Sequence, residues 1–351
     1  ARMARSLTLN PQQHTFLVIA GSALLYSLRT AIVDAAPHTA AGLPRLDDLP
    51  YPHRENMGPG QLAMYLSGAG GCGKSHCINA LKALSRSWGL SNGVTTSAPT
   101  GLASTLIDGH TVHSLYSVPI GHRKATWNNS PSPLTPYLRA AHIHVIDEVS
   151  MLSITTLTYI HCALCKANDM PPFDSNTPLF GGANVVFVGD LAQLAPVLAH
   201  PVYIHFETDL STRQRAQRAA RLHNATTEFE DIGVNLWAAA SAAVVILKIN
   251  NRARSDPAFG HQLAIARNGS FAPNGSVANL MRSRTFATAA GRAKAIAAAL
   301  TTASALDTRI LVCSNAARVA WYTTIYARIA AAAHAAEAPP PIMVEAVISI
   351  D

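Results

Sequence analysis

The eight residues Gly68–Ser75 constrain the fold of this chain more than any other segment. They read Gly-Ala-Gly-Gly-Cys-Gly-Lys-Ser and fit the pattern G-x-x-x-x-G-K-[ST]. Glycines let backbone amides close around phosphate oxygens, and the following helix presents its positive N-terminus to them. The loop follows an apolar run, Ala63–Ser67, and precedes a helical pattern that reaches Leu84. We therefore expect a strand, a phosphate loop and a helix, with Lys74 on the β- and γ-phosphates and the Ser75 hydroxyl on Mg²⁺.

Further short apolar runs alternate with helical stretches, as in a parallel sheet joined by crossover helices. The sequence therefore predicts an α/β fold with a first domain over 61–245. An N-terminal segment, 1–60, precedes it, and a partial, Ala-rich second domain, 246–351, follows, in which Arg309–Cys313 would begin a second sheet. The other runs that we interpret as buried strands are Val94–Ala98, His144–Ile146, Asn184–Val188 and Val244–Leu247.

Composition narrows the class of protein. Apolar residues make up 49 % of the 351 residues, enough for a core, and the formal net charge of +7 favours a polyanionic partner. Five cysteines argue against a disulfide framework, and Cys162 and Cys165 have no second pair at zinc-binding spacing. Polar residues interrupt the apolar run Phe16–Val33, so we expect a buried helix over Pro11–Ala35 and no membrane span. No signal-peptide pattern is evident, and we expect an intracellular protein.

Two of the predicted strands end in polar residues that suit phosphate chemistry. After His144–Ile146 come Asp147, which would hold Mg²⁺ through water, and Glu148, which would accept a proton from the attacking water. After Asn184–Val188, Gln193 stands where it can contact the γ-phosphate or that water. An acidic pair is common at exposed strand ends, so it indicates catalysis only together with the phosphate loop.

Five stretches, in order, resemble the Pif-one-type DNA helicases of superfamily one. The segment Leu9–Gln13 also resembles the family's glutamine motif, which reads adenine, and the similarity covers roughly residues 8–270. The five stretches are Gly68–Ser75, Ala98–Ala103 with Gly109–Ser114, Ile146–Met151, Gly189–Val197 and Leu247–Gly269.

The resemblance implies a RecA-like fold with an incomplete second RecA-like domain, and it assigns roles to residues. Arg252 would reach the γ-phosphate from the start of the second domain, although alone it could be a solvated surface cation. Without the resemblance, Ala98–Ala103 reads equally well as a structural turn. The implied catalytic residues are Lys74, Glu148, Gln193 and Arg252. Nucleotide would be bound by Gln13, Gly68, Gly70, Gly71, Cys72, Gly73, Lys74 and Ser75, magnesium by Ser75 and Asp147, and single-stranded DNA by Thr100, Gly101, His113 and Ser114.

The implied activity is ATP-dependent translocation on single-stranded DNA in the 5′ to 3′ direction, with ATP and Mg²⁺ as cofactors. The resemblance further implies roles in DNA repair, recombination and telomere maintenance, with single strands and junctions as partners. A monomer without a membrane partner is expected, in the nucleus or mitochondria of a eukaryote.

Two departures from the family pattern qualify this expectation. Cys72 replaces the hydroxyl residue usual in the loop, which predicts added thiol sensitivity. The family's late motifs find no match, so we expect a chain truncated before them. A remnant that binds nucleotide or single strands without unwinding is therefore the alternative. A P-loop NTPase that remodels protein complexes is a third reading, against which the similarity over Ala98–Ser114 argues.

Overall fold

The computed structural model describes residues 8–35, 45–51, 57–119, 133–205, 210–212, 214, 225–269, 272 and 274–284. The chain divides into two compact units, Ala1–Ser270 and Phe271–Asp351. In the second unit the described residues form helix α11 (Ser276–Arg284). The strand predicted over Arg309–Cys313 lies outside the described residues.

The first unit is built on a parallel sheet, which in the described part of the chain has six strands in the order β3-β2-β4-β5-β1-β6. All five predicted strands are confirmed to within one residue at either end. The two-residue strand β3 was missed, because so short a segment has no periodicity to detect. The strands are β1 (Ala63–Gly68), β2 (Val94–Ala98), β3 (His110–Thr111), β4 (Ile143–Ile146), β5 (Asn184–Gly189) and β6 (Val244–Leu247).

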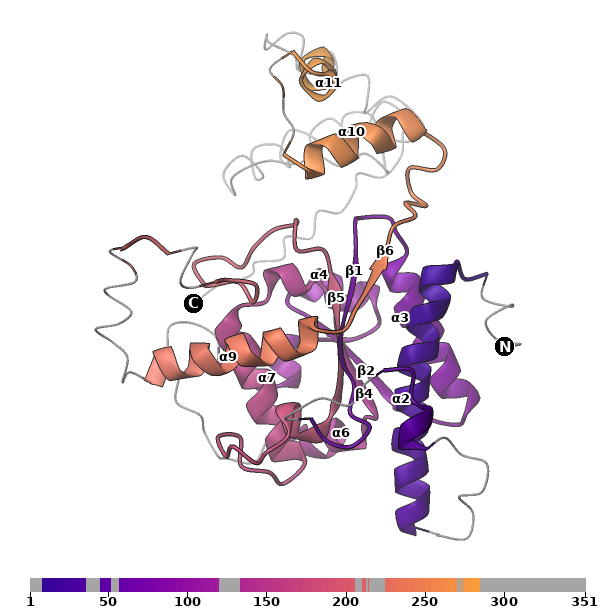
Figure 1. The fold of residues 1–351 in the computed structure, drawn as a ribbon, viewed down its shortest axis with the longest axis vertical. Coiled ribbons are helices and arrows are strands. Elements are labelled where there is room, and N and C mark those ends of the chain that lie inside the picture. The colour runs from indigo at the N-terminus through magenta and orange to yellow at the C-terminus, as the bar shows by residue number, and fades with distance from the viewer. Residues whose placement is uncertain are drawn as a thin grey trace, which may run out of the picture. The chain divides into compact units, whose positions relative to one another are not determined.

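Helices cover both faces of this sheet, with α2 and α3 on one side and α7 and α9 on the other (Figure 1). Side chains of β1 alternate accordingly: Met64 packs in the α2–α3 cluster, and Tyr65 packs in the α7–α9 cluster. Burial on both faces explains why β1, β4 and β5 read as continuous apolar runs. Val244 and Ile246 on β6 are exposed, so the prediction of a buried strand there is wrong for one face. The α/β prediction is confirmed. The helices are α2 (Pro11–Ala35), α3 (Lys74–Ser87), α4 (Gly101–Leu106), α5 (Val112–Leu115), α6 (Thr135–Ala140), α7 (Ile154–Ala167), α9 (Ala225–Ser241) and α10 (Pro257–Arg267), with short 3₁₀ turns η2 (Leu46–Asp48), η3 (Val149–Met151) and η4 (Leu179–Gly182).

Helix α2 has a membrane-like composition but packs in the core. By length and composition alone, Pro11–Ile32 could cross a membrane, so our expectation that no run is long and clean enough is wrong by that criterion. In the structure, however, Phe16, Ala20 and Leu24 are fully buried in the cluster with α3 and the sheet. Their spacing of four residues forms one apolar stripe facing the core. The predicted buried helix is thus confirmed, with the predicted bounds.

Two contacts in the structure cross the predicted boundaries between the three parts of the chain. The boundary between residues 245 and 246 falls inside β6, which pairs with β1, and the first unit continues to Ser270. Helix α2, assigned to the N-terminal segment, packs on α3. The three-part division stays a prediction. Cys162 and Cys165 lie buried on α7 as free thiols.

Candidate active site at the phosphate loop

The phosphate loop joins β1 to α3 at the carboxyl edge of the sheet. Gly71 and Gly73 adopt φ values of 88° and 86°, in the left-handed region that favours glycine. A Cβ atom on Gly71 would lie 2.5 Å from the Cβ of Arg252, so this position requires glycine for space as well. Lys74 Nζ donates to the carbonyl oxygens of Gly68 at 2.8 Å and of Ala69 at 3.3 Å. The lysine therefore curls over its own loop, where a phosphate group would lie.

Gln13 reaches the loop from the start of α2. Its Nε2 donates to the carbonyl oxygen of Cys72 at 3.4 Å, and its side chain is buried. The same residue forms a reciprocal cap with Asn10: each side-chain oxygen accepts the other's backbone amide, at 3.0 and 2.9 Å. Gln13 thus fixes the N-terminus of α2 against the loop, and its role in reading adenine stays a prediction.

The segment after β6 also packs on the loop. The Asn251 amide donates to the carbonyl oxygen of Gly71 at 2.9 Å. Asn250 Oδ1 accepts the backbone amides of Arg252 and Ala253 at 3.0 and 3.1 Å. This turn holds Arg252 beside the loop, as the resemblance implies. The two asparagines were missed, because only the pairing of β6 with β1 brings them to the loop.

The acidic pair follows β4 as expected. Asp147 is buried, and its Oδ1 accepts the backbone amide of Glu148 at 2.9 Å. Burial raises the pKa of Asp147 from 3.8 to about 6, although the Glu148 amide and the charge of Lys74 act in the opposite direction. Glu148 is half-buried and has a φ of 53°, a left-handed conformation uncommon for a residue with a side chain. Such backbone outliers are concentrated at functional sites.

Asp190, at the end of β5, is buried among three donors. The Ala192 amide donates to its Oδ1 at 3.1 Å, and Gln193 Nε2 donates to its Oδ2 at 3.4 Å. Arg267 Nη1, from the last turn of α10, contacts the same Oδ2. Burial alone would raise the pKa of Asp190, but the hydrogen bonds from Arg267 and the Ala192 amide and the charges of Arg267 and Lys74 hold the pKa below its usual value. Gln193 Nε2 lies 3.9 Å from the position that a Cβ on Gly70 would take.

Arg267 was not predicted as a site residue, because nothing in the sequence pairs a cation near the end of a helix with a distant aspartate. Asp190 carried a signal, its place after a buried strand, but only the structure shows its partner. The catalytic and nucleotide-binding assignments at the other positions of the loop stay predictions that this geometry accommodates.

The environment of the Cys72 thiol differs from the one that the predicted thiol sensitivity requires. The residue is 2 % exposed, and burial raises the pKa of the thiol, against smaller opposing effects from Lys74 and the Ala69 backbone. The thiolate is the reactive form of cysteine, so this environment makes it less reactive. The predicted thiol sensitivity is therefore wrong.

The residues predicted to bind DNA follow β2 and β3, which are separated from β1 by two and three strands. Thr100 Oγ1 accepts the Ala103 amide at 3.2 Å and caps α4, and Gly101 is exposed with open space beside it. Ser114 is exposed, and its hydroxyl donates to the Thr111 carbonyl at 3.0 Å. His113 is half-buried on α5, and burial lowers its pKa. They share the edge of the sheet at which the phosphate loop lies, and their role with DNA stays a prediction.

The donor set suits magnesium bound together with a nucleotide. In the described part of the chain, no group of three or more His, Cys, Asp or Glu side chains could hold a metal by itself. Mg²⁺ is usually held by one or two carboxylates plus water and substrate phosphates. The buried carboxyl of Asp147 and the exposed hydroxyl of Ser75, at the start of α3, fit this arrangement.

A phosphate loop on an interior parallel strand, separated by one strand from an acidic strand end, is the arrangement of a RecA-like P-loop fold. Within that class, the sequence model of the family described as PIF1-like helicase matches residues 56–209, so the resemblance seen in the motifs is confirmed over this segment.

Individual proteins that are similar to part of the chain bear related names. The chain is 31 % identical over 140 residues to the ATP-dependent DNA helicase Pif1 of Psychrobacter sp. (strain PRwf-1), covering 38 % of this chain and 20 % of that protein. It is 30 % identical over 149 residues to the ATP-dependent DNA helicase PIF1 of Saccharomyces cerevisiae (strain YJM789), covering 39 % of this chain and 16 % of that protein. The chain thus spans about a fifth or less of these relatives' length.

Among solved structures, a Bacteroides Pif1 bound to single-stranded DNA aligns with a TM-score of 0.42 and 23 % identity, over 61 % of this chain and 44 % of that chain. The Pif1 helicase of Candida albicans aligns with a TM-score of 0.40 and 24 % identity, over 59 % of this chain and 40 % of that chain.

Proposed function

We propose that this chain is the N-terminal motor portion of an ATP-dependent DNA helicase that hydrolyses Mg²⁺–ATP while moving along single-stranded DNA in the 5′ to 3′ direction. The observation that carries the proposal is the packing of three side chains from separate segments, Gln13, Gln193 and Arg252, around one phosphate loop. The names of the relatives, ATP-dependent DNA helicases, support the substrate class.

The chemistry follows from charge and position. Lys74 would leave the loop carbonyls to neutralise the β- and γ-phosphates, and Arg252 would stabilise the charge that develops on the transferred group. Glu148 would accept a proton from the attacking water, which Gln193 orients. Asp147 and Ser75 would hold Mg²⁺, and a bound magnesium ion supplies positive charge that neutralises the phosphates.

The DNA-binding part of the proposal uses Thr100, Gly101, His113 and Ser114. Small residues with amide and hydroxyl donors suit phosphate contacts that do not depend on sequence. Single strands and junctions are the proposed partners, for a monomer acting without a membrane. Roles in repair, recombination and telomere maintenance, and a nuclear or mitochondrial location in a eukaryote, rest on the family resemblance.

The test is ATP turnover by the chain with and without single-stranded DNA. We expect Lys74→Ala to reduce turnover by at least about 100-fold, because a cation aimed at the phosphates is lost. Arg86→Ala is the matched control, because it removes an exposed cation from the same helix. Turnover unchanged in Lys74→Ala would show that this loop is not the hydrolytic site.

Strand displacement separates the proposed helicase from the alternatives. Displacement of a labelled strand that requires ATP supports an unwinding motor. Turnover stimulated by single strands without displacement would indicate the remnant, and turnover indifferent to DNA would indicate an NTPase that remodels protein complexes. A length-extended version of the chain, measured alongside, shows whether a longer chain displaces strands where the 351-residue chain does not.

A further inference from the structure

The carboxylate of Asp190 joins two segments that leave the sheet from different strands. One is the loop after β5, which supplies Gln193, and the other is α10, which follows β6 and supplies Arg267. Both cations that act on Asp190, Arg267 and Lys74, lower its pKa. Asp190 therefore lies at the point where the loop of Gln193, α10 and the phosphate loop meet.

Asp190 is only 2 % exposed, so its charge requires a partner. A buried carboxylate without a cation pays a large desolvation penalty and tends to protonate. Arg267 meets this requirement with its guanidinium on Oδ2, while its side chain remains 37 % exposed. The other oxygen, Oδ1, accepts the Ala192 amide, which carries no charge to balance that of Asp190.

We propose that Arg267 is a positioning residue for Gln193: by pairing with Asp190, it fixes the carboxylate oxygen that holds the side-chain amide of Gln193 beside the phosphate loop. The catalytic consequence rests on the proposed function, whereas the positioning itself does not. Gln193 is otherwise exposed, so this hydrogen bond is what restricts its side chain.

Loss of Arg267 acts on Gln193 in one of two ways. If Asp190 protonates, Oδ2 becomes a poorer acceptor for Gln193 Nε2. If Asp190 stays ionised, its carboxylate is drawn toward Lys74, the other cation that acts on it, and Oδ2 leaves the place that Arg267 fixed. Either way Gln193 Nε2 loses an acceptor that is held at a fixed position.

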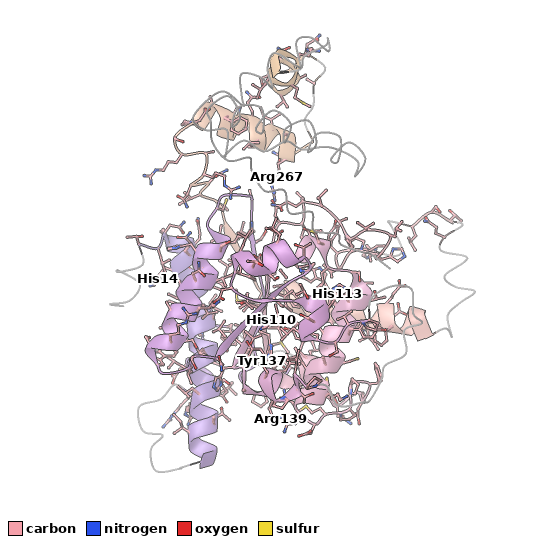
Figure 2. The ribbon with its side chains drawn as sticks, turned by 180° about the vertical axis from the view of Figure 1, so that it is seen from behind. His14, His110, His113, Tyr137, Arg139 and Arg267 are labelled. Carbon is pink, nitrogen blue, oxygen red and sulfur yellow. The ribbon has the colours of Figure 1, made fainter. Side chains whose placement is uncertain are left out.

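The direct test is the side-chain amide signal of Gln193 in a ¹H–¹⁵N NMR spectrum, assigned by its disappearance in Gln193→Ala. Arg267→Met removes the donors and keeps the apolar stem, and we expect the Gln193 signal to move toward that of a solvent-exposed glutamine. Arg267→Lys should restore it in part. Arg139→Met is the matched control, because Arg139 also pairs with an aspartate, Asp169, at 2.6 Å, but lies well away from Arg267 (Figure 2).

An unchanged Gln193 signal in Arg267→Met would overturn the proposal. If the single variant unfolds because Asp190 is left unpaired, the double variant Asp190→Asn with Arg267→Met removes both charges and decides instead. In that protein a displaced Gln193 signal supports the proposal, and a wild-type signal contradicts it.

ATP turnover provides the catalytic test. We expect Arg267→Met to lower kcat about tenfold at unchanged KM, equivalent to roughly 1.4 kcal/mol of lost transition-state stabilisation. In a Gln193→Ala background the same change should have no further effect. An equal tenfold loss in that background would show that Arg267 does not act through Gln193. If the wild-type chain hydrolyses no ATP, the proposed function fails, and the NMR measurement still decides the positioning.

Discussion

At the residue scale, the buried carboxyl of Asp147 lowers the stability of the folded protein at neutral pH. The carboxyl is buried because Asp147 directly follows β4, an interior strand of the sheet. Burial raises its pKa to about 6. A folded-state pKa above the unfolded value means that the native protein binds more protons between about pH 4 and pH 6. For this group alone, stability is therefore greatest at low pH and is lost as the pH rises through that window.

Asp147→Asn should make the protein more stable above pH 6, because the amide carries no charge to desolvate. The gain should be on the order of 1–3 kcal/mol at pH 7 and should vanish below about pH 4. Urea midpoints of both proteins from pH 4 to pH 7.5 measure it. Buried His144, whose pKa is lowered to about 4, has the opposite dependence on pH, but it is present in both proteins and cancels. Parallel profiles for the two proteins would contradict the prediction.

At the element scale, a buried lysine fixes the turn that leads from α4 into β3. Lys82 Nζ, on α3, donates to the carbonyl oxygens of Ile107 and Asp108, both at 3.0 Å, and to Asp108 Oδ2 at 3.1 Å. Asp108 has a φ of 50°, a left-handed conformation that aspartate adopts more readily than most residues. The lysine thereby positions β3 and the capped helix α5, which carries His113 and Ser114.

Lys82→Met should destabilise the first unit by about 1–3 kcal/mol, because it leaves carbonyl oxygens beneath the turn without a donor. Denaturant unfolding followed by circular dichroism measures the change. Asp108→Asn is the control, because its side chain is exposed and the carbonyl contacts remain. A Lys82→Met protein as stable as the wild type would show that solvent satisfies these carbonyls.

The elements that the sequence predicted well are those whose signal is local. Buried parallel strands are continuous apolar runs, and the phosphate loop and the Asp147–Glu148 pair each follow one of them. The two-residue strand β3 has no such signal. Contacts set by strand order could not be predicted: Asn251 meets Gly71 only because β6 lies beside β1, and Arg267 meets Asp190 only because α10 follows β6.

At the scale of the whole molecule, α2 belongs to the same cooperative unit as the sheet. Leu24→Ala should destabilise that unit by about 2–5 kcal/mol, because it empties a fully buried site between α2 and its neighbours. The free energy of opening that hydrogen exchange reports at β5 amides should fall by the same amount as the free energy of unfolding measured in urea. Val18→Ala, on the exposed side of the helix, is the control. Unchanged exchange in β5 would mean that α2 unfolds independently.

The order in which the ribosome makes the strands has a consequence for nucleotide binding. β1 is synthesised first, yet its two neighbours, β5 and β6, are the last strands of the sheet to emerge. Pairing of this kind closes long loops and is therefore slow. Until Leu247 has left the exit tunnel, β6 cannot pair with β1, and the Asn250–Arg252 turn cannot pack against the phosphate loop. Under the proposed function, the complete nucleotide site would therefore exist only after β6 has paired with β1, and bound nucleotide would stabilise that completed sheet.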